Sequence, residues 1–488
     1  MTSKKKNYNL FIFGTKGDLV QRKIFSALYR LEKKNKLTNN VQIIGISRSS
    51  SSNKEYINII YNALKKFLNE TIKLSVWNKF KKRFIFCKIN INKIQNFKKL
   101  IVFIKNKYDI LIHYFAVSSD MFVKICKGLA SIQCNKDNSK IIIEKPIGKS
   151  LNTFYDINQS IKKYFSEKQI FRIDHYLGKE AILNLISLKF ANPLFYNILN
   201  KDYVDHVQIT LSESIGIENR WNYFDQTGQI IDMVQNHILQ IISIFAMNTP
   251  KSLHKNHIYD EKIKILKSLR NINKNNIHKY VSLGQYSKGI INNQPVLDYL
   301  HENKAQKNSI TETFVAMKLY LDTKIWKNVP FYIRTGKRLK KKCSKIVIFL
   351  KKTKNMLFNN IQSQDKLNRI TVDLQSTSKI AIKLFNKIPK LDSSFKLKPL
   401  ELSYDYKKFF PHHYIPEEYE RLLTEIMQNN KFLFVHQKEI IYSWKWIDPI
   451  IQAYQEYPSL LQYYSAGTWG PESSHKLIQQ DNKNWDNH

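Results

Sequence analysis

The chain lacks several features that define other classes of protein. Its 488 residues contain no run of 18 or more apolar residues, so the sequence predicts no membrane-spanning helix. The start, residues 1–14, is basic and then apolar, but the apolar part is too short for a signal peptide and runs into a glycine turn. No C-x-x-C pair or disulfide framework is expected from the four cysteines, Cys87, Cys126, Cys134 and Cys343. These absences favour a cytoplasmic protein in a reduced compartment.

Acidic residues and glycine are also scarce. The 39 acidic residues face 79 basic ones, and a formal net charge of +40 can indicate a nucleic-acid partner or an anionic surface. The lysines, however, are spread along nearly the whole chain among asparagine and isoleucine. Only 13 glycines are present, where an average composition would give roughly 34. We attribute this pattern to an AT-rich genome, a hypothesis that a gene of ordinary base composition would refute. Basic and aromatic residues do not cluster, so no nucleic acid and no membrane is expected as a partner.

The apolar residues are sufficient for two domains or more. The first ~145 residues alternate strand-like with helix-like stretches such as 18–34, which predicts a parallel, doubly wound sheet. The strand candidates are residues 8–14, 41–47, 83–89, 109–117 and 140–146. From about residue 203, period-two segments at 205–214 and 343–352 predict antiparallel strands with one wet face. We therefore expect a Rossmann-like α/β domain over 1–175 and a larger α+β domain with a mainly antiparallel sheet over 176–488.

A glycine turn follows the first predicted strand. GTKGDL (14–19) joins that strand to a helix, where glycines allow a tight turn and free N–H groups attract a phosphate. Two glycines alone are weak evidence, but they carry more weight in a chain so poor in glycine. At the end of the second strand, where an NAD enzyme has Asp or Glu, stand Ser47 and Arg48. An arginine there suits the 2′-phosphate of NADP⁺, and the alternative is a solvated arginine at a strand end.

The stretch RIDHYLGKE (172–180) lies at the predicted domain junction, where ligand clefts are common. If it is helical, His175 and Lys179 are i and i+4 and project from one face, which suits a phosphate monoester. Asp174 would point elsewhere and could orient an imidazole. The alternative is an exposed helix whose charged pair has no function.

Two later segments add polar groups. The apolar stretch 228–247 is expected to be a buried helix, interrupted by Asp232, Gln235, Asn236 and His237. Asp232 and His237 are five residues apart, about 140° around a regular helix, so spacing alone does not direct both at one ligand. A histidine oriented by a carboxylate is a suitable base near neutral pH. A single histidine in a buried apolar helix is, however, more often a hydrogen-bonded core residue than a catalyst. The segment 329–343 adds a basic turn with Gly336 and Lys337, which as charge alone would be a solvated loop.

Taken together, these segments resemble the glucose-6-phosphate dehydrogenase family almost from end to end. RIDHYLGKE itself is similar to the family's signature, and the other motifs fall in family order: GTKGDL, EKPIGKSL (144–151), YFDQTGQIIDMVQNHILQ (223–240), VPFYIRTGK (329–337), EEYERLL (417–423) and GTWGP (468–472). The resemblance implies oxidation of the C1 hydroxyl of glucose 6-phosphate to the lactone, with hydride passing to NADP⁺, the first step of the oxidative pentose phosphate pathway. One base suffices for this chemistry and no metal is needed.

The site residues are implied by position within the family. His237 would take the hydroxyl proton and Asp174 would orient it, while Lys145, followed by a cis Pro146, would lie between cofactor and sugar. The sugar phosphate would be held by His175, Tyr176 and Lys179, the sugar hydroxyls by Glu213 and Asp232, and the pocket completed by Lys337 and Lys342. The NADP site would be lined by Gly14, Thr15, Gly17, Asp18, Leu19, Lys23, Arg48 and Lys145. A homodimer or homotetramer is implied, through the sheet of the second domain.

The chain departs from the family pattern at a few positions. Ser118 and Ser119 replace a Pro-Pro pair, Trp221 and Asn222 replace a glycine-containing turn, and Ile231 replaces a basic residue. None of these removes a residue assigned to the chemistry, so we expect an active enzyme. The rival readings are a sugar-phosphate dehydrogenase of other specificity, a basic nucleic-acid-binding protein, and an inactive structural remnant.

Overall fold

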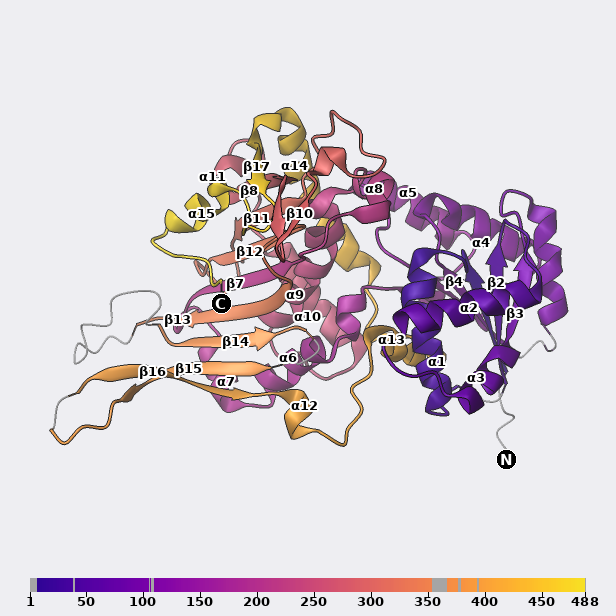
Figure 1. The fold of residues 1–488 in the computed structure, drawn as a ribbon, viewed down its shortest axis with the longest axis horizontal. Helices are drawn as coiled ribbons and strands as arrows, with labels where there is room; N and C mark the ends of the chain where they lie inside the picture. Colours follow the sequence, from indigo (N-terminus) through magenta and orange to yellow (C-terminus); the bar gives the residue numbers. More distant parts are fainter. Residues whose placement is uncertain are drawn as a thin grey trace. The chain divides into compact units, whose positions relative to one another are not determined.

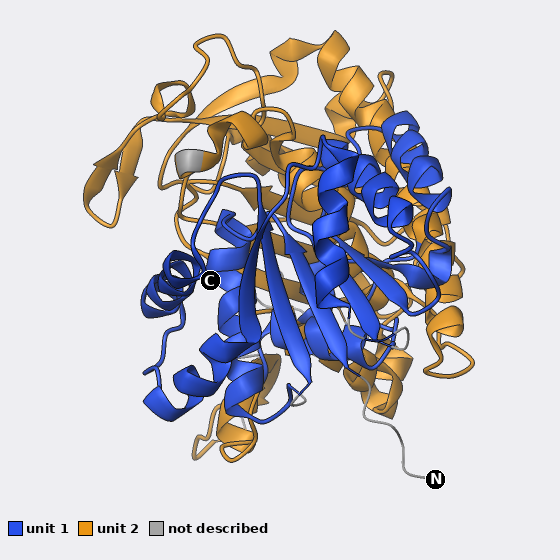
Figure 2. Ribbon diagram, turned by 90° about the vertical axis from the view of Figure 1, so that its right-hand side faces the viewer, with its two compact units in different colours: residues 1–178, 416–436 blue, residues 179–415, 437–488 orange. Residues whose placement is uncertain are grey.

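A computed structural model describes residues 7–37, 40–104, 106, 109–352, 367–375, 379–392 and 395–487. The chain divides into two compact units, coloured separately in Figure 2. Unit 1 comprises Met1–Gly178 and Pro416–His436, and unit 2 comprises Lys179–Ile415 and Gln437–His488. None of the helices in these ranges has both the length and the apolar composition that a membrane span requires.

Unit 1 is built on a six-stranded parallel sheet in the order β3-β2-β1-β4-β5-β6. The strands are β1 (Tyr8–Phe13), β2 (Val41–Ser47), β3 (Phe84–Lys88), β4 (Ile110–Phe115), β5 (Ser139–Ile143) and β6 (Ile170–Arg172). They are almost continuous apolar runs because both faces of such a sheet are covered. The strand order reverses between β1 and β4, and ligands of doubly wound sheets bind at the carboxyl ends of the strands beside such a reversal.

Helices connect these strands (Figure 1). They are α1 (Phe25–Lys33), α2 (Asn53–Phe67), α3 (Leu74–Phe80), α4 (Phe122–Ser131) and α5 (Leu151–Lys162). Ser52 begins α2 with a capping box, since its hydroxyl accepts from the Glu55 N–H at 3.2 Å and the Glu55 carboxylate accepts from the Ser52 N–H at 2.9 Å. A Ser150–Thr153 box begins α5 in the same way.

A returning segment completes unit 1. Helix α13 (Glu418–Met427) lies far along the chain, yet it packs on α1 and the sheet of this unit. Arg30 pairs with Glu417 at 2.8 Å, and the Lys140 ammonium donates to the Ile426 carbonyl at 2.8 Å. Residues 416–436 therefore belong to the first unit although they follow most of the second in the sequence.

Unit 2 is built on a nine-stranded mixed sheet in the order β16-β15-β14-β13-β7-β12-β11-β8-β17. Its strands are β7 (Val204–Ser212), β8 (Val281–Ser287), β11 (Phe314–Leu319), β12 (Phe331–Gly336), β13 (Cys343–Leu350), β14 (Arg369–Asp373), β15 (Ile380–Lys387), β16 (Leu397–Tyr404) and β17 (Leu461–Ser465). All neighbours are antiparallel except β7 with β12 and β8 with β17. The predicted fold class, a doubly wound α/β domain with a larger α+β domain and a mainly antiparallel sheet, is confirmed.

The expectation of one wet face on the strands at 205–214 and 343–352 is wrong. Both β7 and β13 are buried along almost their whole length. On one face Phe245 of α9 (Leu239–Ala246) packs edge-on against Phe331 of β12, with ring centroids 6.2 Å apart. On the other face the C-terminal residues cover the polar positions, because Asp486 pairs with Lys345 at 3.2 Å. Alternating polar residues thus mark a polar interior contact here, not exposure to water.

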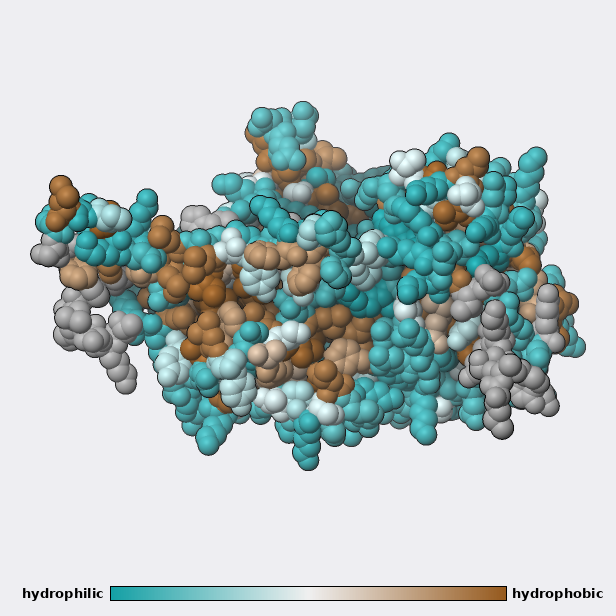
Figure 3. Space-filling view, turned by 90° about the horizontal axis from the view of Figure 1, so that it is seen from below, coloured by the Kyte–Doolittle hydropathy of each residue, from teal (hydrophilic) through white to brown (hydrophobic). Residues whose placement is uncertain are grey.

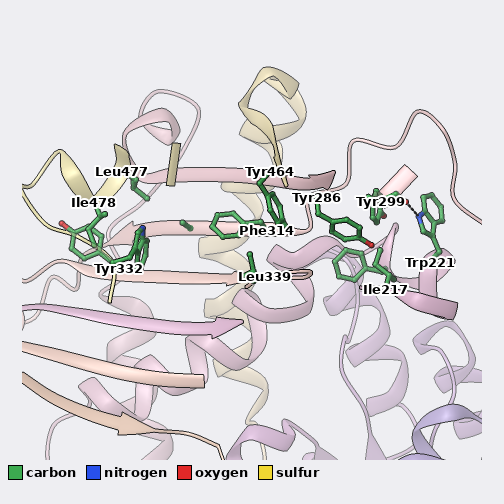
Figure 4. Packing of buried hydrophobic residues seen from close by; sticks show 13 residues of the cluster. Ile217, Trp221, Tyr286, Tyr299, Phe314, Tyr332, Leu339, Tyr464, Leu477 and Ile478 are labelled. Carbon is green, nitrogen blue, oxygen red and sulfur yellow. Dashed lines mark hydrogen bonds between the residues drawn. The ribbon is translucent and has the colours of Figure 1, made fainter. Parts of the chain in front are cut away.

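An aromatic cluster forms part of the core of unit 2 (Figure 4). Trp221 is 1% exposed, stacks on Tyr299 with centroids 5.5 Å apart, and donates its indole N–H to the Tyr299 carbonyl at 3.3 Å. The departure from the family pattern at Trp221 is therefore a core residue that anchors the turn before residue 228.

The buried helix predicted at 228–247 exists, but its first part is a π-helix. This π-helix, η8 (Ile230–Ile238), continues directly into α9. The hydrogen bonds of a π-helix join residues five apart, so the 140° separation expected for Asp232 and His237 on a regular helix does not apply. Residues at that spacing lie about one turn apart, on similar sides.

Candidate functional site

The glycine turn after β1 is closed tightly against β2 and β4. Gly14 has a φ of +84°, donates its N–H to the Ile46 carbonyl at 3.0 Å, and would place a Cβ only 2.2 Å from the Ala116 carbonyl oxygen. The Gly17 N–H donates to the Gly14 carbonyl at 2.8 Å. A side chain at Gly14 would collide with the strand end at Ala116, so only glycine allows this tight turn before the helix, whose first N–H groups are the kind that attract a phosphate.

A second cation stands beside Arg48. The loop after β2 exposes Arg48, and the Lys16 ammonium reaches the same loop, donating to the Ser49 hydroxyl at 3.1 Å and the Ser50 carbonyl at 3.3 Å. Sequence reasoning missed Lys16, although a basic residue inside GTKGDL was a visible signal. Two cations at the end of β2 suit a negatively charged group such as a phosphate better than an uncharged ribose hydroxyl.

The other residues proposed around this turn have separate surroundings. The buried Thr15 hydroxyl forms a hydrogen bond with the Tyr56 hydroxyl at 2.6 Å and so faces the core. Asp18 pairs with Arg22 at the surface, 2.6 Å away. Leu19 precedes the short π-helix η1 (Val20–Ile24). Lys23 pairs with Glu418 of α13 at 2.9 Å. The Thr15 side chain therefore packs in the core, and the role of these residues at the cofactor stays a prediction.

Lys145 follows β5, and its peptide bond to Pro146 is cis, as the resemblance implied. The preceding Glu144 accepts hydrogen bonds from the hydroxyls of Tyr114 and Tyr419, the latter at 3.3 Å. Burial raises the pKa of Glu144 to about 7, against the lowering effects of the Tyr114 hydrogen bond and the Lys145 charge. Sequence reasoning missed this carboxyl group.

RIDHYLGKE does not form the single helix that would place His175 and Lys179 on one face. After β6 the chain makes a short 3₁₀ helix, η6 (His175–Gly178), and Lys179 is the extended N-cap of α6 (Glu180–Phe190). The i, i+4 argument for these two side chains is therefore wrong. Asp174 is 2% exposed, and its carboxylate accepts the Tyr176 N–H at 3.0 Å, which fixes the start of η6.

Helix α13 holds this turn within unit 1. The ring of Tyr419 is nearly parallel to that of His175, with an interplanar angle of 13° and centroids 6.3 Å apart. The Arg421 guanidinium donates to the Gly178 carbonyl at 2.6 Å. The turn that carries His175 and Tyr176, proposed as phosphate ligands, is thus held by residues that lie more than 240 positions later in the chain.

In unit 2, the structure brings together Glu213, Asp232 and Lys337. Glu213 follows β7 and Lys337 follows β12, and because these two strands are parallel neighbours, both residues emerge at one edge of the sheet. The Lys337 ammonium forms an ion pair with the Glu213 carboxylate. Burial would raise the pKa of Glu213, but the charge and hydrogen bond of Lys337 outweigh it and lower the pKa, with Asp232 close enough to oppose this. Lys337 is 2% exposed, so the solvated-loop alternative for 329–343 is wrong at this residue.

Two other proposed residues have surroundings of their own. Lys342 is exposed and lines a cavity of about 320 Å³ whose other charged residues include Arg369, Asp373 and Lys379, and whose lining contains none of the trio. His237, 1% exposed, follows Asp232 by five residues on η8. His237 belongs to unit 2 and Asp174 to unit 1, so their pairing stays a prediction.

A doubly wound sheet with a glycine cradle after its first strand, together with a unit that gathers carboxylates and a buried lysine at a sheet edge, is the arrangement of a nucleotide-dependent dehydrogenase. Two family models match the chain: "Glucose-6-phosphate dehydrogenase, NAD binding domain" over residues 11–184 and "Glucose-6-phosphate dehydrogenase, C-terminal domain" over 186–486. The chain belongs to the glucose-6-phosphate dehydrogenase family.

Individual relatives agree. The chain is 50% identical over 488 residues to the glucose-6-phosphate 1-dehydrogenase of Buchnera aphidicola subsp. Baizongia pistaciae, covering 99% of this chain and 100% of that one. It is 40% identical to that of Dickeya dadantii, covering 99% of both. Among solved structures, a glucose-6-phosphate dehydrogenase in complex with its substrate glucose 6-phosphate superposes with a TM-score of 0.88 at 27% identity over 99% of both chains.

Proposed function

We infer that this protein oxidises glucose 6-phosphate to 6-phosphoglucono-1,5-lactone, passing hydride to NADP⁺. The observation that carries the inference is the group of Glu213, Asp232 and Lys337, where Glu213 and Lys337 follow the C-terminal ends of the central strands β7 and β12. Two carboxylates, Glu213 and Asp232, accept hydrogen bonds from sugar hydroxyls, and the buried Lys337 keeps Glu213 ionised. A polyol is the substrate class that such acceptors recognise.

The reaction requires one base and a fixed sugar. His237 is proposed to take the C1 hydroxyl proton, with Asp174 holding the imidazole in the orientation that accepts it. His175, Tyr176 and Lys179 are proposed to hold the phosphate, so that binding energy from the far end of the sugar positions C1. Lys145 is proposed to lie between sugar and cofactor, and Lys342 to complete the pocket. NADP⁺, when bound, supplies the hydride acceptor.

The preference for NADP⁺ over NAD⁺ is supported by Lys16 and Arg48. A 2′-phosphate carries two negative charges that a ribose hydroxyl lacks, and both cations stand at the loop after β2. The glycine cradle supports a dinucleotide in general, and these two side chains support the phosphorylated one.

We also propose a cytoplasmic enzyme that assembles as a homodimer or homotetramer. Its sequence domains are proposed at 1–175 and 176–488, the second of which contributes residues 416–436 to unit 1. Strands β15 and β16 at the edge of the unit 2 sheet expose Leu384, Leu400 and Leu402 by 36, 49 and 63%. Figure 3 views the molecule from below, and brown side chains gather on this face. An exposed apolar sheet edge is normally covered in solution, and a second copy of the chain is the occupant implied by the family.

The test is the absorbance of NADPH during incubation of the purified protein with NADP⁺ and one sugar at a time. We expect turnover with glucose 6-phosphate, at least a hundredfold lower kcat/KM with unphosphorylated glucose, and slower turnover with NAD⁺. Faster turnover of another hexose phosphate would support the rival sugar-phosphate dehydrogenase. Absence of turnover with every sugar would support an inactive remnant.

A further inference from the structure

One short segment contacts two backbone positions of the substrate site: Lys337, and the start of the helix that carries Asp232. Asp232 lies on η8, and Lys337 follows β12. Between them stand Glu312 and Thr313, the two residues before β11. The Lys337 N–H donates to the Thr313 carbonyl at 2.9 Å, and the Gln229 N–H at the start of η8 donates to the Glu312 carbonyl at 3.1 Å.

The Glu312 side chain reinforces this connection. Its carboxylate accepts the Ile230 N–H, the first of η8, at 2.9 Å. The N-cap residue of η8, Gln229, makes no capping hydrogen bond with its own side chain, which instead donates to the Thr335 hydroxyl at 2.7 Å. Since the first N–H groups of a helix have no partner within the helix, Glu312 supplies from another element the cap that η8 lacks.

The fit around this carboxylate is close. Gly228 has a φ of +64°, and a Cβ there would lie 2.3 Å from a Glu312 carboxylate oxygen. Glu312 is 5% exposed, and burial raises its pKa to about 7 while the Ile230 hydrogen bond lowers it. The side chain is therefore held in one position against the start of η8, at the margin of the aromatic cluster that contains Phe314 (Figure 4).

We propose that Glu312 is a positioning residue for the substrate site: it fixes the start of η8, and with it Asp232, relative to Lys337 and Glu213. The proposal rests on the proposed function, in which Asp232 and Glu213 hold sugar hydroxyls. Glu312 touches neither sugar nor cofactor in this account. Its loss would tilt the first turn of η8, so that the hydroxyl ligands no longer match the sugar held by its phosphate.

The experiment compares three substitutions in the full chain. Glu312→Ala removes the cap, Glu312→Asp keeps the charge but withdraws it by one methylene group, and Glu312→Gln keeps an acceptor oxygen at the same reach. We expect Ala and Asp to raise the KM for glucose 6-phosphate about tenfold with kcat within about threefold of the parent. Gln should restore KM to within about threefold, and KM for NADP⁺ should stay within twofold in all three.

The matched control is Asp405→Ala. Asp405 caps α12 (Tyr406–Phe409) in the same unit by accepting the Lys407 N–H at 2.8 Å. Its removal should leave KM for glucose 6-phosphate unchanged. An equal rise of KM in the control, or KM within twofold of the parent in both the Asp and Ala variants, overturns the proposal. If Ala does not fold, the contrast between Asp and Gln decides. Parent activity with glucose 6-phosphate tests the proposed function separately. If the parent has no turnover, that function is refuted, and the same ratios, taken from dissociation constants for glucose 6-phosphate measured by calorimetry, test the role of Glu312.

Discussion

The two side chains of the Glu213–Lys337 ion pair differ in exposure, so removing one or the other should cost different amounts of unfolding free energy. The Lys337 side chain is 2% exposed, whereas that of Glu213 is 34% exposed. Replacing Glu213 by glutamine would leave a buried ammonium without its counter-charge, which costs about 3 kcal/mol at a buried pair. Replacing Lys337 by methionine leaves a carboxylate that water can reach, which costs about 1 kcal/mol. We therefore expect Glu213→Gln to destabilise the protein clearly more than Lys337→Met.

Urea unfolding at pH 7.5, followed by circular dichroism, gives the free energy of unfolding for each variant. The control is Lys379–Glu401, an exposed pair at 2.9 Å with side chains 42 and 46% exposed, where either single substitution should cost less than about 0.5 kcal/mol. If Lys337→Met costs as much stability as Glu213→Gln, the buried ammonium is not the group that controls the stability of the pair.

The same pair predicts a dependence on pH. The pKa of Glu213 is lowered from its ordinary value of 4.5, so the pair stabilises the fold above that value and loses its effect as pH falls through the lower, folded pKa. The difference in unfolding free energy between the parent and Lys337→Met should therefore be constant from pH 6 to 8. It should shrink in acid, below about pH 4.

Two further predictions concern unit 1. The single substitutions Lys16→Ser and Arg48→Ser should each raise the KM for NADP⁺ roughly tenfold, because each removes one charge-assisted hydrogen bond of about 1.5 kcal/mol. The KM for NAD⁺ should stay within twofold of the parent. Equal effects on both cofactors would exclude a role of these cations at the 2′-phosphate. Glu144→Gln should become more stable relative to the parent as pH rises from 5 to 8. The pKa of Glu144 is raised to about 7, so folding favours its neutral form and the parent loses stability when that group ionises. The expected change is on the order of 2 kcal/mol in unfolding free energy, and a pH-independent difference would contradict it.

Local features of the fold were predictable because local residues determine them. The apolar runs at 8–14 and 41–47 became β1 and β2, since a strand buried on both faces needs a continuous apolar sequence. The glycine turn between β1 and η1 was predictable because a close approach of backbone to the Ala116 carbonyl excludes a side chain at Gly14. Lys16 could have been found from the same six residues.

Features that depend on distant contacts were not predictable. Nothing in 416–436 indicates that α13 packs on the first unit, because an amphipathic helix shows which face it buries and not against what. The apolar pattern of 228–247 is the same for an α- and a π-helix, so the angle between Asp232 and His237 was misjudged. The polar residues of β7 were expected to face solvent, because their partners lie far away in the C-terminal residues. Gln208 of β7, for example, donates to the Asn484 carbonyl at 2.8 Å. Glu312, more than 70 residues from η8, carries no local signal for its contact with that helix.

The most direct test of the account is the turnover of His237→Asn. Asparagine keeps a polar side chain in a position that is 1% exposed but cannot accept the hydroxyl proton. We predict that kcat for glucose 6-phosphate falls by about a thousandfold or more, consistent with loss of a general base, while calorimetric binding of glucose 6-phosphate stays within about threefold. The surface variant His254→Asn should match the parent in both. Turnover of His237→Asn within a few fold of the parent would contradict the assignment of the base.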